Sequence, residues 1–131
     1  MLAQERRQRL VAAMREAGIG HMVLYGNAWQ GDYLRYGADF GILEGHGVAL
    51  IAADGDVELF LDSATDAERA ELEAPQVKVH LAPDIARTVG ARLDRVANAR
   101  IAAAPRRFVP RWLTDTARTF KLEDATTAGA T

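Results

Sequence analysis

The side chains that could perform acid–base or metal chemistry are few and widely spaced along the sequence. The three histidines are His21, His46 and His80, and none belongs to an H-x-x-x-H or H-E-x-x-H pair. His21 and His80 fall in or beside expected strands, so we interpret them as packing or sheet-edge residues. His46 instead closes a loop bounded by glycines, and binding residues gather on loops, so His46 is a candidate ligand-facing residue.

Two groups of carboxylates are candidates for general acid–base catalysis. Asp32, Asp39 and Glu44 lie in one segment, and Asp62 and Asp66 lie near the end of an expected hairpin. Charged residues make up 26% of the chain, which is ordinary for a soluble protein. We therefore interpret both groups as solvated surface.

Motifs for other kinds of chemistry are missing from the sequence. There is no G-x-x-x-x-G-K-[ST] phosphate loop, no G-x-G-x-x-G after an expected strand and no G-x-S-x-G around Ser63. The chain has no cysteine, which excludes disulfides, thiolate metal ligands and thiol catalysis. The sequence therefore predicts no catalytic residue, no metal ligand and no cofactor in this chain.

The distribution of charge argues against a nucleic-acid or membrane partner. The formal net charge is −2, and the basic cluster of Arg106, Arg107 and Arg111 is narrower than a nucleic-acid-binding face. The chain begins with the charged segment MLAQERRQRL, and no segment approaches the roughly 20 apolar residues that cross a bilayer. We expect a cytoplasmic protein.

Apolar periodicity predicts alternating helices and strands around these residues. The expected helices cover 4–17, 28–36, 64–73, 83–96 and a segment that begins at Pro110; the expected strands cover 22–25, 47–52, 57–61, 77–81, 100–103 and 120–125. Asp54–Gly55 separates two of these strands and suits a tight hairpin turn, because both residue types tolerate positive φ. Trp29 and Trp112 have helical spacing and are expected in the core.

This order of elements predicts a single α/β domain over residues 1–131. We expect three α/β/α layers with a mixed, about six-stranded sheet that contains one central hairpin. The glycine-bounded loop before His46 has few apolar anchors other than Phe40, Ile42 and Leu43.

The N-terminal third of the sequence resembles the creatinase/prolidase N-terminal domain. That family typically opens with a helix of the form R-x-x-x-L-x-x-x-M-x-x-x-G-I, and the residues in this register here are Arg6, Leu10, Met14, Gly18 and Ile19. An aliphatic strand, an asparagine and a Y-L-T-G-F-like helix end usually follow, matched here by Met22–Tyr25, Asn27 and Tyr33–Gly37. The stretch from Asn27 to Tyr33 is longer than in the family pattern, and Tyr36 stands where threonine is usual.

Later segments extend this resemblance over nearly the whole chain. The hairpin Val48–Leu61 and the segment GARLDRVANARIAAAP are similar to the corresponding family elements. The resemblance implies a non-catalytic accessory or dimerisation domain of an Xaa-Pro peptidase or related C–N hydrolase. It implies a separate C-terminal "pita-bread" catalytic domain that carries the divalent metal and is absent from this chain. That domain, a second subunit in a homodimer, or both would be its partners.

The same resemblance implies that the loop 37–46 shapes the rim of an active site. The rim residues would be Tyr36, Asp39, Phe40 and His46. Two alternatives from other classes stay open. One is a free-standing module that binds a small ligand or a protein through this loop, and the other is a small unrelated α/β enzyme that uses Asp32, Asp39 or His46.

Overall fold

The computed structural model describes residues 2–29, 34, 38, 40–96, 101–104 and 122–124. Within these ranges the elements are, in chain order, α1 (Leu2–Ala17), β1 (His21–Asn27), β2 (His46–Ala52), β3 (Val57–Leu61), α3 (Ala64–Glu73), β4 (Lys78–Leu81), α4 (Ile85–Asp94), β5 (Ile101–Ala104) and β6 (Leu122–Asp124). The expected helix that begins at Pro110 lies outside the described residues, as do Trp112 and most of the expected helix 28–36.

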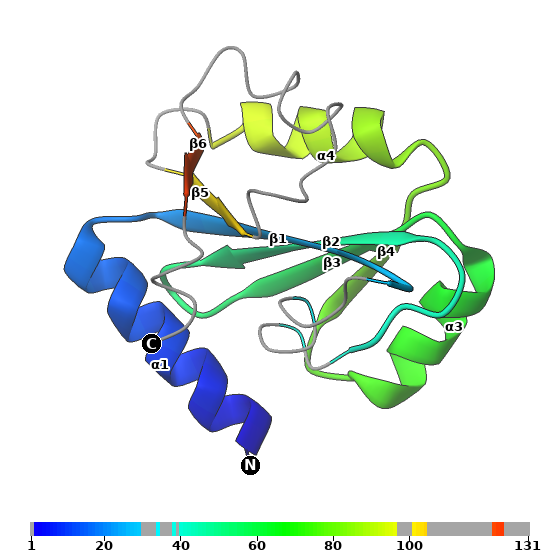
Figure 1. Cartoon of the computed structure of the whole chain (residues 1–131), viewed down its shortest axis with the longest axis horizontal. Coiled ribbons are helices and arrows are strands. Elements are labelled where there is room, and N and C mark those ends of the chain that lie inside the picture. The colour runs from blue at the N-terminus through cyan, green and yellow to red at the C-terminus, as the bar shows by residue number, and fades with distance from the viewer. Residues whose placement is uncertain are drawn as a thin grey trace.

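The described strands form one mixed six-stranded sheet in the order β4-β3-β2-β1-β5-β6 (Figure 1). The pairs β1–β2 and β2–β3 are antiparallel, whereas β1–β5, β3–β4 and β5–β6 are parallel. The expected hairpin is present as β2 and β3. Its turn contains Gly55 at a φ of 99°, a backbone angle that glycine adopts without the strain that a Cβ would cause.

Two helices cover one face of the sheet. Leu10 and Met14 of α1 and Ala67 and Ala70 of α3 pack against every second residue of the central strands. The strand residues in this cluster are Met22, Leu24, Ala49, Ile51, Val57, Leu59 and Leu61. This cluster also takes in Phe40 and Ile42, so the chain before β2 is anchored in the same core.

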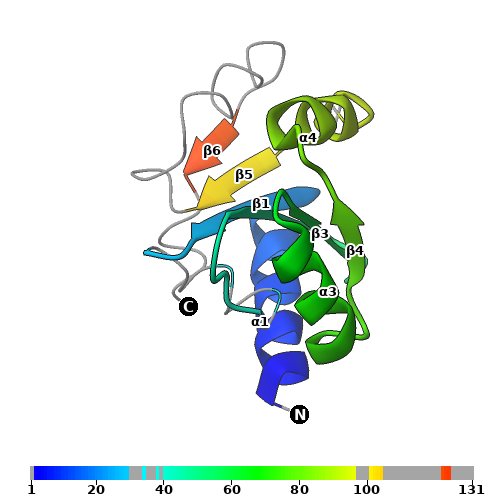
Figure 2. The same ribbon diagram turned by 90° about the vertical axis from the view of Figure 1, so that its right-hand side faces the viewer.

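The third described helix, α4, covers the opposite face through Ile85, Val89 and Leu93. The strand residues that it covers are Val23, Tyr25, Val48, Leu50, Phe60 and Ile101. Figure 2 shows α4 on one side of the sheet and both α1 and α3 on the other. Because β1 and β2 are buried on both faces, their sequences are continuous apolar runs. The prediction of an α/β fold with a mixed sheet is therefore confirmed.

The prediction that Trp29 packs in the core is wrong. Its side chain is 90% exposed. Residues 28–29 form a bend after β1, where the Trp29 backbone N–H donates to Asn27 Oδ1 at 2.8 Å. Residues 28–29 thus belong to this bend and not to a helix, and the indole is left exposed. In the described ranges, no helix is long and apolar enough to span a membrane.

Candidate functional site: the loop at the β1–β2 end of the sheet

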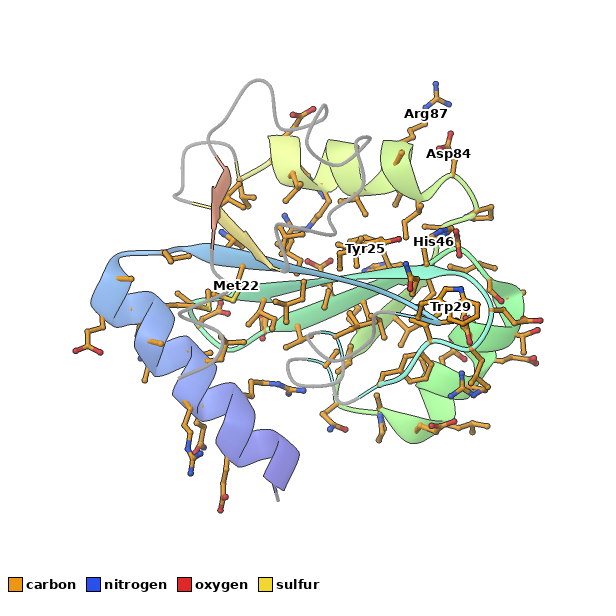
Figure 3. All side chains as sticks on the ribbon, viewed as in Figure 1. Met22, Tyr25, Trp29, His46, Asp84 and Arg87 are labelled. Carbon is orange, nitrogen blue, oxygen red and sulfur yellow. The ribbon has the colours of Figure 1, made fainter. Side chains whose placement is uncertain are left out.

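The ends of three neighbouring strands lie together at one end of the sheet. Asn27, the last residue of β1, pairs with His46, the first residue of β2, and Gly47 pairs with Leu61 at the end of β3. Antiparallel pairing thus brings together polar residues from 27 to 62 that are far apart in the sequence. Figure 3 shows Tyr25, Trp29 and His46 grouped at this end of the sheet.

Asp66, in the first turn of α3, holds the loop at this end of the sheet. Its side chain is fully buried, at 0% exposure. It accepts backbone N–H bonds from Leu43 at 3.1 Å, Glu44 at 3.1 Å and Gly45 at 3.2 Å, and it pairs with Arg69 Nη1 at 2.8 Å. The interpretation of Asp66 as solvated surface is therefore wrong, because a neighbouring loop covers it and satisfies its oxygens.

The electrostatics of Asp66 favour its charged form. Burial by itself raises the pKa of this carboxyl, but the backbone donors of Glu44, Gly45 and Leu43, together with Arg69, outweigh it. The net result is a pKa below the ordinary value for aspartate. A carboxylate that stays ionised holds three consecutive loop residues against the start of α3.

Arg69 fastens the preceding part of the loop. Its Nη1 and Nη2 donate to the carbonyl oxygen of Gly41 at 3.3 and 3.2 Å. Its guanidinium carbon also lies 4.8 Å from the centre of the Phe40 ring, a cation–π distance. Asp66 and Arg69 together therefore fix residues 40–45 from one helix.

His46 and Asp62 form a close pair beside this loop. Asp62 Oδ1 accepts the backbone N–H of His46 at 2.7 Å, and Asp62 Oδ2 lies 2.8 Å from His46 Nδ1. The carboxylate can only accept, so Nδ1 carries the proton and Nε2 is the ring nitrogen left for a partner. The imidazole also stacks on the Tyr25 ring, with centroids 6.2 Å apart.

Small residues allow this close approach. A Cβ on Gly45 would overlap the Asp62 carboxylate, so glycine is required there as the pair stands. Ser63 Oγ donates to Glu44 Oε2 at 2.9 Å and accepts the Asp66 N–H at 3.4 Å as the N-cap of α3. Hydrogen bonds thus hold Gly41 and residues 43–46 of the loop, whereas Phe40 and Ile42 are held by core packing.

The predicted site residues differ in exposure, and two of them lie outside the described residues. The His46 side chain is 51% exposed, whereas Phe40 is buried at 1% beneath Arg69. Tyr36 and Asp39, like Asp32, lie outside the described residues. Asp62 and Asp66 were interpreted as solvated surface, and Arg69 was not singled out from the sequence.

The other two histidines are strand residues. His80, on the edge strand β4, stacks on Phe60 at 4.8 Å and lies 3.1 Å from Glu58 Oε1 through Nε2. His21 begins β1 and lines a pocket at the far end of the sheet. In the part of the chain that the structure describes, no three histidine or carboxylate side chains are grouped to hold a metal ion.

Residues 6–128 match the family model of the creatinase/prolidase N-terminal domain. The chain therefore belongs to this family. A comparison with curated proteins gives no match.

Solved structures of similar fold include an aminopeptidase, a dipeptidase and a peptidase N-terminal domain. The aminopeptidase P of Streptococcus thermophilus has a TM-score of 0.77 at 13% identity, over 99% of this chain and 97% of that chain. The N-terminal domain of cytoplasmic peptidase PepQ from Mycobacterium tuberculosis has a TM-score of 0.75 at 19% identity, over 96% of each chain. The Xaa-Pro dipeptidase of Bacillus anthracis has a TM-score of 0.72 at 18% identity, and this chain spans 34% of it. At these identities the likeness shows the fold.

Proposed function

We propose that this chain acts as the non-catalytic accessory domain of a creatinase/prolidase-like metallohydrolase that cleaves Xaa-Pro peptides or a related C–N bond. The observation that carries the proposal is the family match over residues 6–128. Within this proposal the two domains divide the labour. The divalent metal would belong to a separate C-terminal catalytic domain.

Within this proposal, the loop 37–46 forms part of the rim of the active site, with Tyr36, Asp39, Phe40 and His46 as its residues. Fixation of the loop by Asp66 and the half-exposed imidazole of His46 support such a role. His46 would present Nε2 to the substrate or to the partner. Phe40 is buried, so it would support the rim indirectly, through the contact of its ring with the Arg69 guanidinium.

The partner that contacts this end of the sheet would be the catalytic domain, of the same polypeptide or of a second subunit in a homodimer. Two large apolar side chains are exposed in the segments next to this end: Trp29, after β1, at 90% and Leu43, before β2, at 65%. Contiguous apolar patches mark surfaces that a partner covers, whereas single side chains do not, and we propose that both residues belong to such a contact.

The activity of the 131-residue chain tests the division of labour. The purified chain, supplied with Mn²⁺ and an Xaa-Pro dipeptide, is expected to show neither turnover nor stoichiometric metal binding by calorimetry. Turnover, or uptake of one or more metal ions per chain, would contradict the proposal.

The gene provides a second test. An open reading frame that continues beyond Thr131 into a domain with carboxylate and histidine metal ligands is expected. A stop codon directly after Thr131 would instead favour a free-standing binding module.

A further inference from the structure

A second concave site lies at the opposite end of the sheet from His46. There, His21 at the start of β1 pairs with Ala52 at the end of β2, and the described residues line a pocket of about 640 Å³. This volume lies within the range of small-molecule sites. Figure 1 shows that the last turn of α4 points toward this end of the sheet.

The pocket is lined mainly by polar and charged residues, together with the buried Leu50 and Val57. The cationic side chains in the lining are Lys78 of β4 and Arg92 and Arg95 of α4 and the residue after it. The hairpin turn between β2 and β3 contributes the carboxylates of Asp54 and Asp56.

These opposite charges do not neutralise one another. Arg92 is occupied by Glu58, with Nε and Nη2 each 2.8 Å from Glu58 Oε2. Among the described residues, Lys78, Arg95, Asp54 and Asp56 make no ion pair. Two cations and two carboxylates thus line one concave space without an ion-pair partner in the described part of the protein.

His21 lines the same pocket. Burial and the positive charge of Arg92 lower the pKa of His21, although Asp54 and Glu58 oppose this, so the imidazole is neutral at pH 7. His21 therefore adds no charge to the lining of the pocket.

We propose that this pocket binds a small zwitterion of the amino-acid or dipeptide class. Its carboxylate lies toward Lys78 and Arg95, and its ammonium group lies toward the carboxylates of Asp54 and Asp56. A simple anion would leave the two carboxylates unpaired, and a simple cation would leave Lys78 and Arg95 unpaired. The site is separate from the proposed rim and does not depend on it.

Calorimetric titration of the 131-residue chain with three related probes tests the charge requirement. Glycylglycine carries both charges, N-acetylglycine lacks the ammonium group, and glycinamide lacks the carboxylate. We expect saturable binding of glycylglycine at millimolar concentrations or below. Each single-charge probe should bind on the order of tenfold more weakly, since one charge-assisted contact is lost.

Substitutions then locate the site. Lys78→Gln and Asp54→Asn should each weaken glycylglycine binding on the order of tenfold. Asp54→Asn keeps the oxygen that accepts the Asp56 N–H at 3.0 Å, so the turn is preserved. Arg87→Gln is the matched control, because Arg87 is an exposed arginine of α4 outside the pocket lining; its affinity should equal that of the unmodified chain.

Three results would overturn the proposal. The first is no saturable heat with glycylglycine. The second is binding of N-acetylglycine or glycinamide as tight as that of glycylglycine, which would show a site for one charge only. The third is unchanged affinity in both Lys78→Gln and Asp54→Asn with their thermal unfolding intact, which would place the ligand elsewhere.

Discussion

At the scale of single residues, Asp66 determines the conformation of the loop before β2. The substitution Asp66→Asn removes the charge that Arg69 pairs with and turns one acceptor oxygen into a donor facing backbone N–H groups. We expect the free energy of unfolding to fall by about 2–4 kcal/mol, because buried partners are left unsatisfied. Urea unfolding followed by circular dichroism measures this change.

Glu71→Gln is the control for that experiment, because Glu71 is an exposed acidic residue on the same helix. It should leave the urea midpoint unchanged. Equal midpoints for Asp66→Asn and the unmodified chain would mean that the loop is held by packing alone.

A second residue-scale prediction concerns pH and Glu58, which joins β3 to α4 through Arg92. Burial raises the pKa of Glu58, but Arg92 and His80 outweigh burial, so the pKa lies below the ordinary value. A lowered folded-state pKa contributes stability above the unfolded-state pKa, near 4.3, and this contribution is lost as pH falls through the folded-state value.

The difference in unfolding free energy between the unmodified chain and Glu58→Gln should therefore be largest at neutral pH and shrink below about pH 4. Urea unfolding at several pH values between neutral and acid measures it. A difference that grows on acidification would refute the assigned direction of the pKa.

At the scale of elements, the β2–β3 hairpin depends on the backbone angle of Gly55. A Cβ there meets no atom within 4 Å, so any cost of substitution comes from the positive φ of 99° and not from crowding. We expect Gly55→Ala to destabilise the chain by about 1–2 kcal/mol. Gly55→Asn should cost less, because asparagine tolerates positive φ better. Thermal unfolding compares the two, and an equal loss in both would point to a cause other than backbone strain.

At the scale of the whole molecule, the two ends of the sheet differ in character. One end carries the fixed loop with exposed Trp29 and Leu43, and the other carries the charged pocket beside α4. If a second subunit covers the loop end, the chain sediments as a monomer–dimer mixture. Trp29→Ser should then raise the dimer dissociation constant on the order of tenfold or more, since buried tryptophans often dominate interfaces.

Leu72→Ser is the matched control for sedimentation, because Leu72 is 84% exposed and lies toward the far end of α3. It should leave the dissociation constant unchanged. A chain that stays monomeric at every concentration would contradict the homodimer contact and leave a catalytic domain of the same polypeptide as the partner.

The sequence by itself predicted most of the described elements and the class of fold. The apolar runs of β1 and β2, the Asp54–Gly55 turn and the amphipathic spacing of α4 are local patterns, so they could be read without a structure. The order of helices and strands then limited the fold to an α/β domain with a mixed sheet. The loop around His46 was also identified, because glycines bound it and a histidine closes it.

Only the tertiary structure decided which polar residues act together. The Leu43 N–H and Asp66 are 23 residues apart, and His46 and Asp62 are 16 apart, so no local spacing reveals these pairs. Strand pairing brings them to one end of the sheet, where each carboxylate accepts hydrogen bonds from the loop, as buried polar groups generally do. The same pairing places His21, Asp54 and Arg92 around one pocket, and the bend after Asn27 leaves Trp29 in solvent. Charge and exposure depend on these long-range contacts, whereas helix and strand formation depends mainly on neighbours in the sequence.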